Sequence, residues 1–90
     1  MARRENYNDL YLFMLVVREG SFTAAAQRLG LAQSGVSRAV RELEERLGVQ
    51  LLVRTTRKLS LTQAGEQLYR TVEAGFDALD SGLSTLAYYR

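Results

Sequence analysis

The segment Phe22–Leu47 constrains the fold most strongly, because it holds two helical patterns with almost no chain between them. The first pattern is rich in alanine, starts at Ser21 or Thr23 and ends just before Gly30. Gly30 can adopt the positive φ that a tight turn requires. The segment therefore predicts two helices joined by a turn of about three residues, with alanines at 24–26 where the helices must cross closely.

The second helix of this pair, expected over Gln33–Leu47 with Gly48 as its stop, has two different sides. The side that should pack on the core carries Val36, Val40, Leu43 and Leu47, which fall within a narrow arc at about 100° per residue. The outer side is polar and basic in its first half, with Ser34, Arg38 and Arg41, and acidic in its second, with Glu42, Glu44 and Glu45. Only the first half can therefore approach phosphate groups at low electrostatic cost.

Further elements flank the pair. Asn8 suits the N-cap of a first helix that ends at Gly20. After Gly48 the string LLVRTTRKLSL has two short apolar stretches around a polar turn at 55–58, which is typical of a β-hairpin. Thr62 then caps a last helix over about 63–88.

The last helix carries a longer apolar stripe than a core built from the first 60 residues can cover. We expect the exposed remainder to pair with the same helix of a second chain. The glycines at 65, 75 and 82 lie on or beside the stripe, and they fit either close backbone approach or drift at tolerant positions. The predicted dimerisation residues are Leu68, Val72, Phe76, Leu79, Leu83 and Leu86.

Composition excludes several functions. Ninety residues, 47% of them apolar, can build one compact core. The absence of cysteine and histidine removes thiolate metal sites and the commonest neutral-pH base, so we expect neither an enzyme nor a bound metal or cofactor. The apolar run at 10–17 is too short to cross a bilayer, and we expect a soluble cytoplasmic protein.

The two parts of the chain carry net charges of opposite sign. Residues 1–62 carry ten basic and six acidic side chains, whereas residues 63–90 carry two and four. A basic front half suggests a polyanionic partner. Together with the helix-turn-helix layout and the pairing helix, it predicts binding to duplex DNA. The alternative is a protein-interaction module that dimerises through its last helix.

The string SFTAAAQRLGLAQSGVSRAVRELEERLGVQLLVRTTRKLSLTQAG resembles the N-terminal DNA-binding domain of LysR-type transcriptional regulators. The resemblance covers about residues 8–88. It implies a mainly α fold, with a winged helix-turn-helix of three helices plus a two-stranded β-wing over 1–61 and a dimerisation or linker helix over 62–90. It also implies a homodimer or higher oligomer, paired through the linker helix, on double-stranded DNA with interrupted dyad symmetry. Such regulators continue into an effector-binding domain, so we expect this chain to be a fragment and any small-molecule effector to act through a domain outside it.

The resemblance also implies which residues meet DNA. Ser21 and Thr23 would lie near phosphate, and the recognition helix would present Gln33, Ser34, Ser37 and Arg38 to bases and nearby phosphates. Arg54 in the wing would reach the backbone or the minor groove. Arg57 and Lys58, on the turn of the wing, favour phosphate contact, and Arg41 either contacts DNA or pairs with Glu45.

Physical arguments support two of these roles and mark two departures. An arginine such as Arg38 can fork onto guanine, or contact phosphate without reading sequence, and Gln33 can serve adenine or stay solvated. Ser34 and Gly35 stand where the family commonly has Pro and Ala, which should loosen the start of the helix but let the backbone come closer to DNA. Leu52 stands where the family usually has Phe, which should alter packing under the wing.

Overall fold

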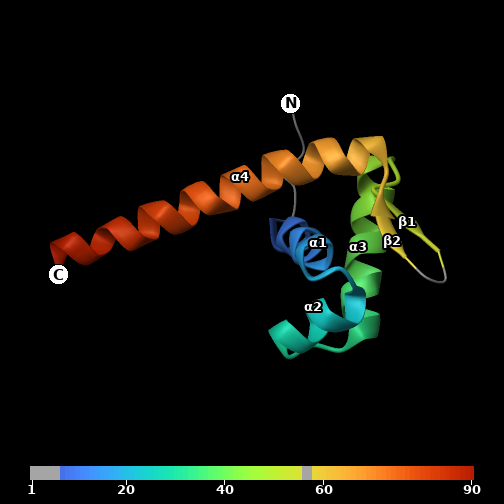
Figure 1. Ribbon diagram of the computed structural model, residues 1–90, viewed down its shortest axis with the longest axis horizontal. Coiled ribbons are helices and arrows are strands. Elements are labelled where there is room, and N and C mark those ends of the chain that lie inside the picture. Colours follow the sequence, from blue (N-terminus) through green and yellow to red (C-terminus); the bar gives the residue numbers. More distant parts are fainter. Residues whose placement is uncertain (1–6, 56–57) are drawn as a thin grey trace.

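The computed structural model describes residues 7–55 and 58–90. Three helices form a small body, a two-stranded wing projects from one side, and a long last helix crosses the body and extends beyond it (Figure 1). The elements are α1 (Tyr7–Glu19), α2 (Phe22–Leu29), α3 (Gln33–Leu47), β1 (Leu52–Arg54), β2 (Leu59–Leu61), α4 (Gln63–Thr85) and a final 3₁₀ turn (Leu86–Tyr89). The predicted mainly α architecture is thereby confirmed.

The core lies where the first three helices meet the start of the wing. Every one of these elements contributes side chains that are almost fully buried, so the helix pair is held by the body and not by its own propensity. The small alanines of α2 let it cross α3 closely, as the sequence predicts. The buried set comprises Phe13, Leu15, Val16, Ala25, Ala26, Val36, Val40, Leu43, Leu51 and Leu52.

Helix α2 is fixed at both ends, by Ser21 and Gly30. Ser21 caps α2, since its Oγ accepts a hydrogen bond from the Ala24 amide at 3.0 Å. Gly30 ends the helix with φ +69°, a conformation that side chains with a Cβ disfavour. Ala32 precedes α3 and gives it no side-chain cap. The Gly35 amide donates to the Ala32 carbonyl at 3.1 Å, so the Gln33 and Ser34 amides at the start of α3 are the ones without a side-chain cap.

The wing is an antiparallel hairpin, as predicted. Its register pairs Leu52 with Leu61 and Arg54 with Leu59. The Thr55 hydroxyl donates to the Lys58 carbonyl at 2.7 Å, and the Lys58 amide donates to the Thr55 hydroxyl at 3.1 Å, which closes the ends of the turn. Both strands are only three residues long, too short for an isolated hairpin to be stable in water.

Thr62 joins the wing to α4. Its hydroxyl accepts from the Gly65 amide at 3.0 Å, which confirms the predicted cap, and donates to the Gln50 carbonyl at 2.6 Å. Gly65 lies directly on the backbone of Leu51, so a Cβ at this position would stand 2.0 Å from the Leu51 carbonyl oxygen. Close approach thus explains this glycine, whereas Gly75 and Gly82 face open space within the chain.

The first half of α4 packs on α1. The Arg18 guanidinium lies 3.2 Å from a carboxylate oxygen of Glu73 and 3.2 Å from one of Asp77, one helical turn apart. The Tyr11 and Phe76 rings meet edge to face with centroids 5.2 Å apart. Beyond this contact α4 leaves the body, as the orange-to-red end of the ribbon shows in Figure 1.

Four local predictions are wrong. Asn8 lies inside the first turn of α1 and does not precede it. Leu47 is 38% exposed, because the C-terminal turn of α3 runs past the core. Glu44 is only 9% exposed, since the start of the wing folds back over its side of the helix. The α-helical part of α4 ends at Thr85, and the chain tightens into the 3₁₀ turn.

Candidate nucleic-acid interface

A cleft opens where the N-terminal ends of α2 and α3 meet the wing. It has a volume of about 340 Å³. Five of the residues predicted to meet DNA line it together, although they come from three separate elements. The lining comprises Gly20, Ser21, Phe22, Gln33, Ser37, Arg54, Thr55, Lys58 and Leu59.

The first two turns of α3 form one wall of this region and lie open to solvent. Gln33, Ser34, Gly35 and Arg38 are exposed, and Ser37 is half-buried on the cleft side. A Cβ built on Gly35 would meet nothing within 4 Å, so the backbone can be approached closely there. Neither α2 nor α3 has an acidic residue in its first turn, and the positive ends of both helix dipoles are therefore uncompensated on this side.

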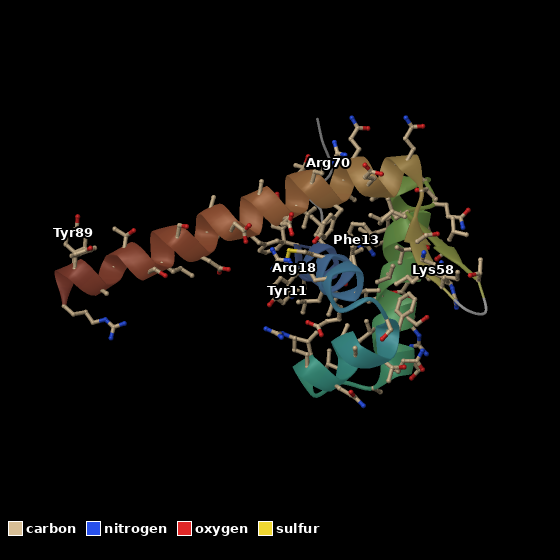
Figure 2. All side chains as sticks on the ribbon, viewed as in Figure 1. Tyr11, Phe13, Arg18, Lys58, Arg70 and Tyr89 are labelled. Atoms are coloured by element: carbon tan, nitrogen blue, oxygen red, sulfur yellow. The ribbon has the colours of Figure 1, made fainter. Side chains whose placement is uncertain are left out.

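Other predicted contact residues surround the cleft. Thr23 and Arg41 are exposed, and within the described part of the chain Arg41 has no ion pair with Glu45. Lys58 stands at the turn of the wing, where Figure 2 labels it. Arg57 lies outside the described residues. Arg70 is on α4, at the upper edge of the body in Figure 2 and outside the cleft lining, and forms an ion pair with Glu66 at 2.5 Å.

Arg54 lines the cleft, and its guanidinium contacts side chains of α3 and α2. Its Nη2 is 3.1 Å from Oε1 of Glu44, and its guanidinium carbon lies 5.4 Å from the centre of the Phe22 ring. Its Nε and Nη2 are buried without a hydrogen bond of good geometry. Sequence reasoning placed Glu44 on the outer face and did not assign Phe22, so it missed both partners of Arg54. The available signal was that Glu44 follows Leu43, at the edge of the apolar arc.

The predicted dimerisation residues divide into two groups. Leu68, Val72 and Phe76 pack against the body, with Val72 only 7% exposed. Leu79 and Leu83, on the projecting half of α4, are 61% and 66% exposed, and Leu86, at the start of the 3₁₀ turn, is 54% exposed. An apolar groove of about 310 Å³ joins the two groups, lined by Tyr7, Leu10, Leu68, Thr71, Val72, Gly75, Phe76 and Leu79.

Other kinds of site find little support in residues 7–55 and 58–90. These residues contain no group of three or more carboxylate side chains placed to hold a metal ion. Within the same ranges, no helix combines the length and the apolar character needed to span a bilayer.

Comparisons with known proteins converge on one family. The chain is 46% identical over 85 residues to the HTH-type transcriptional regulator PgrR of Escherichia coli, and 48% identical over 79 residues to the HTH-type transcriptional regulator PtxR of Pseudomonas aeruginosa. These matches cover 94% and 88% of the chain but only 28% and 25% of the two regulators. The chain thus spans less than a third of the length of its curated relatives.

Solved structures agree with this assignment. The BenM_DBD/catB site 1 DNA complex superposes with a TM-score of 0.85 at 36% identity, covering 93% of each chain. Full-length AphB, a virulence activator of Vibrio cholerae, superposes with a TM-score of 0.84 at 34% identity, covering 91% of this chain and 28% of AphB. The family model for bacterial regulatory helix-turn-helix proteins of the lysR family matches residues 7–66. The chain therefore belongs to the LysR family of bacterial regulatory helix-turn-helix proteins.

Proposed function

We propose that this chain is the sequence-specific DNA-binding part of a dimeric transcriptional regulator. The observation that carries the proposal is the cleft that gathers Ser21, Gln33, Ser37, Arg54 and Lys58 from three elements beside an open, basic helix face. The likeness to a protein crystallised with DNA supports it. Residues 1–61 form the DNA reader and residues 62–90 the linker helix, and the regulator acts in the cytoplasm.

The first half of α3 enters the major groove. Arg38 is exposed there and offers a planar fork that matches the O6 and N7 of guanine, while Gln33 can bond adenine in bidentate fashion. Gly35 allows the backbone of α3 to approach the duplex closely. The half of α3 that carries Glu42 and Glu45 stays away from the phosphates, because like charges repel.

Phosphate contacts flank the reading helix. Ser21, Thr23 and Ser34 supply hydroxyls at the starts of α2 and α3, where the uncompensated helix dipoles favour an anion. Arg41 continues the basic face of α3 along the groove. Arg54, Arg57 and Lys58 place the wing on the backbone or the adjacent minor groove. These contacts fix register and orientation, whereas the base contacts of α3 select the sequence.

Pairing of two chains through α4 sets the symmetry of the DNA site. Leu79, Leu83 and Leu86 are large apolar side chains left exposed, and a second copy of the helix would cover them. The groove beside them, with Leu68, Val72 and Phe76 in or along its wall, continues the same apolar surface. A two-fold pair then carries two recognition helices, which fits a site with interrupted dyad symmetry.

Titration with mixed duplex DNA at rising salt concentration tests the proposal. We expect binding whose logarithm falls linearly with the logarithm of salt concentration, with a slope near −0.9 for each phosphate neutralised. Arg38→Ala should weaken binding to a preferred site by about 1 to 3 kcal/mol. Arg70→Ala is the matched control, because it removes the same charge from α4, outside the cleft.

Two results would contradict the proposal. One is the absence of binding at micromolar concentrations in low salt, which would favour a protein-interaction module that dimerises through α4. The other is an equal loss of affinity in the Arg38 and Arg70 variants, because net charge alone would then account for binding.

A further inference from the structure

Glu44 is a buried carboxylate that connects α3 to the wing. Its Oε2 accepts hydrogen bonds from the amides of Leu51 and Leu52, at 2.8 and 3.0 Å. Its Oε1 lies 3.1 Å from Nη2 of Arg54. All three partners belong to β1 or to the residue just before it, so one side chain of the helix that carries the DNA-facing residues fixes the whole first strand.

Arg54 carries this connection into the cleft. Its guanidinium forms an ion pair with the Glu44 carboxylate of α3 and lies 5.4 Å from the centre of the Phe22 ring of α2, so contacts from both helices restrain it. It lines the same cleft as Ser21, Gln33 and Lys58, with 27% of its side chain exposed. Three-residue strands cannot hold the hairpin by their own pairing. The wing side of the cleft is therefore held by contacts outside the hairpin's own pairing, namely the burial of Leu51 and Leu52 and the hydrogen bonds and ion pair of the Glu44 carboxylate.

We propose that Glu44 is a positioning residue for DNA recognition, which acts through Arg54 and β1 to fix the wing relative to the first half of α3. This proposal rests on the function proposed above. An acidic residue can support DNA binding in this way because the Glu44 carboxylate points inward to the wing. The neighbouring Glu45 is exposed to solvent.

The positioning role and simple electrostatics predict opposite changes in DNA affinity when the negative charge of Glu44 is removed. Removing a negative charge near a polyanion should strengthen binding, since it reduces repulsion. If Glu44 positions the wing, its removal should weaken binding despite the same change in net charge. Glu44→Gln and Glu45→Gln make this comparison at adjacent positions of one helix.

The experiment measures the affinity of the full chain for a selected duplex and for mixed duplex DNA over a range of salt concentrations. For Glu45→Gln we expect unchanged or tighter binding and an unchanged salt slope. For Glu44→Gln we expect binding of the selected duplex to weaken by about fivefold or more, and the salt slope to fall by about 1 as a wing phosphate contact is lost. Circular dichroism in the same buffers gives the folded fraction, by which each affinity is corrected.

Glu44→Asp keeps the negative charge but shortens the side chain. This variant tests the positioning role if Glu44→Gln does not fold. We expect it to weaken binding and to lower the salt slope in the same direction. The inference is overturned if either folded variant binds the selected duplex as tightly as Glu45→Gln, with the wild-type salt slope. If the wild-type chain binds no DNA, the proposed function itself fails, and the two failures are thereby distinguished.

Discussion

A methyl group added at Gly65 should force the last helix away from the wing. An ideal Cβ there would lie 2.0 Å from the Leu51 carbonyl oxygen and 2.8 Å from its carbonyl carbon. Ordinary carbon to oxygen contacts are about 3.3 Å or longer, so the two backbones must separate by more than about 1 Å. No side-chain rotation can relieve this overlap, because the contacted atoms belong to the main chain.

The cost of Gly65→Ala has three parts. Overpacking costs about 1 to 3 kcal/mol. The shift also strains the hydrogen bond from the Thr62 amide to the Leu51 carbonyl, now 3.0 Å long and worth about 1 kcal/mol. Alanine in a helix offsets about 1 kcal/mol relative to glycine. The expected net loss is about 1 to 3 kcal/mol, which corresponds to a fall in Tm of roughly 4 to 24 °C for a domain of this size.

Thermal unfolding followed by circular dichroism measures this change, with Gly75→Ala as the matched control. Gly75 lies on the same helix with open space around it, so alanine should raise the Tm by roughly 4 to 8 °C. Measurement at two protein concentrations separates any effect on chain pairing, because Gly75 lines the apolar groove. A Gly65→Ala variant as stable as the wild type would refute the close-packing argument.

Two further predictions concern α4. In analytical ultracentrifugation, Leu79→Arg should convert the dimer into a monomer, because it places a charge in the apolar face. Ala78→Arg should leave the dimer intact. A wild-type chain that sediments as a monomer would contradict the pairing. Burial, and then the hydrogen bond that Tyr69 donates to Glu73, raise the pKa of the Tyr69 phenol above its ordinary value near 10. The neutral phenol therefore stabilises the fold below about pH 10, and this contribution is lost as the pH rises through the raised pKa. The free energy of unfolding should consequently fall more steeply with alkaline pH for the wild type than for Tyr69→Phe. Parallel curves for the two proteins would refute this.

Local signals predicted most of the fold. Ser21, Gly30, Gly48 and Thr62 mark helix ends through caps and positive φ, which depend only on neighbouring residues. The turn residues at 55–58 likewise placed the hairpin between its two strands. Helix caps and turns can be predicted from the sequence because the interactions that form them involve residues close together in the chain.

The failures arose where distant elements meet. Periodicity around α3 placed Leu47 with the core, and the sequence analysis placed Glu44 on the outer side although it lies at the edge of the apolar arc. Burial was decided by the wing, which folds back over Glu44 and leaves Leu47 beyond the core. The same return of the chain turns Arg54 inward. Likewise, only the contact with Leu51 shows that Gly65 differs from Gly75.

Enrichment of bound duplexes from a random DNA pool tests the central claim most directly, using the wild-type chain and Arg38→Ala in parallel. We predict that the wild type enriches two half-sites related by dyad symmetry. The variant should enrich the same arrangement with its base preference relaxed at one position in each half-site. A wild-type pool without an enriched sequence, or an Arg38 variant that loses affinity equally for every sequence, would contradict the claim that α3 reads bases.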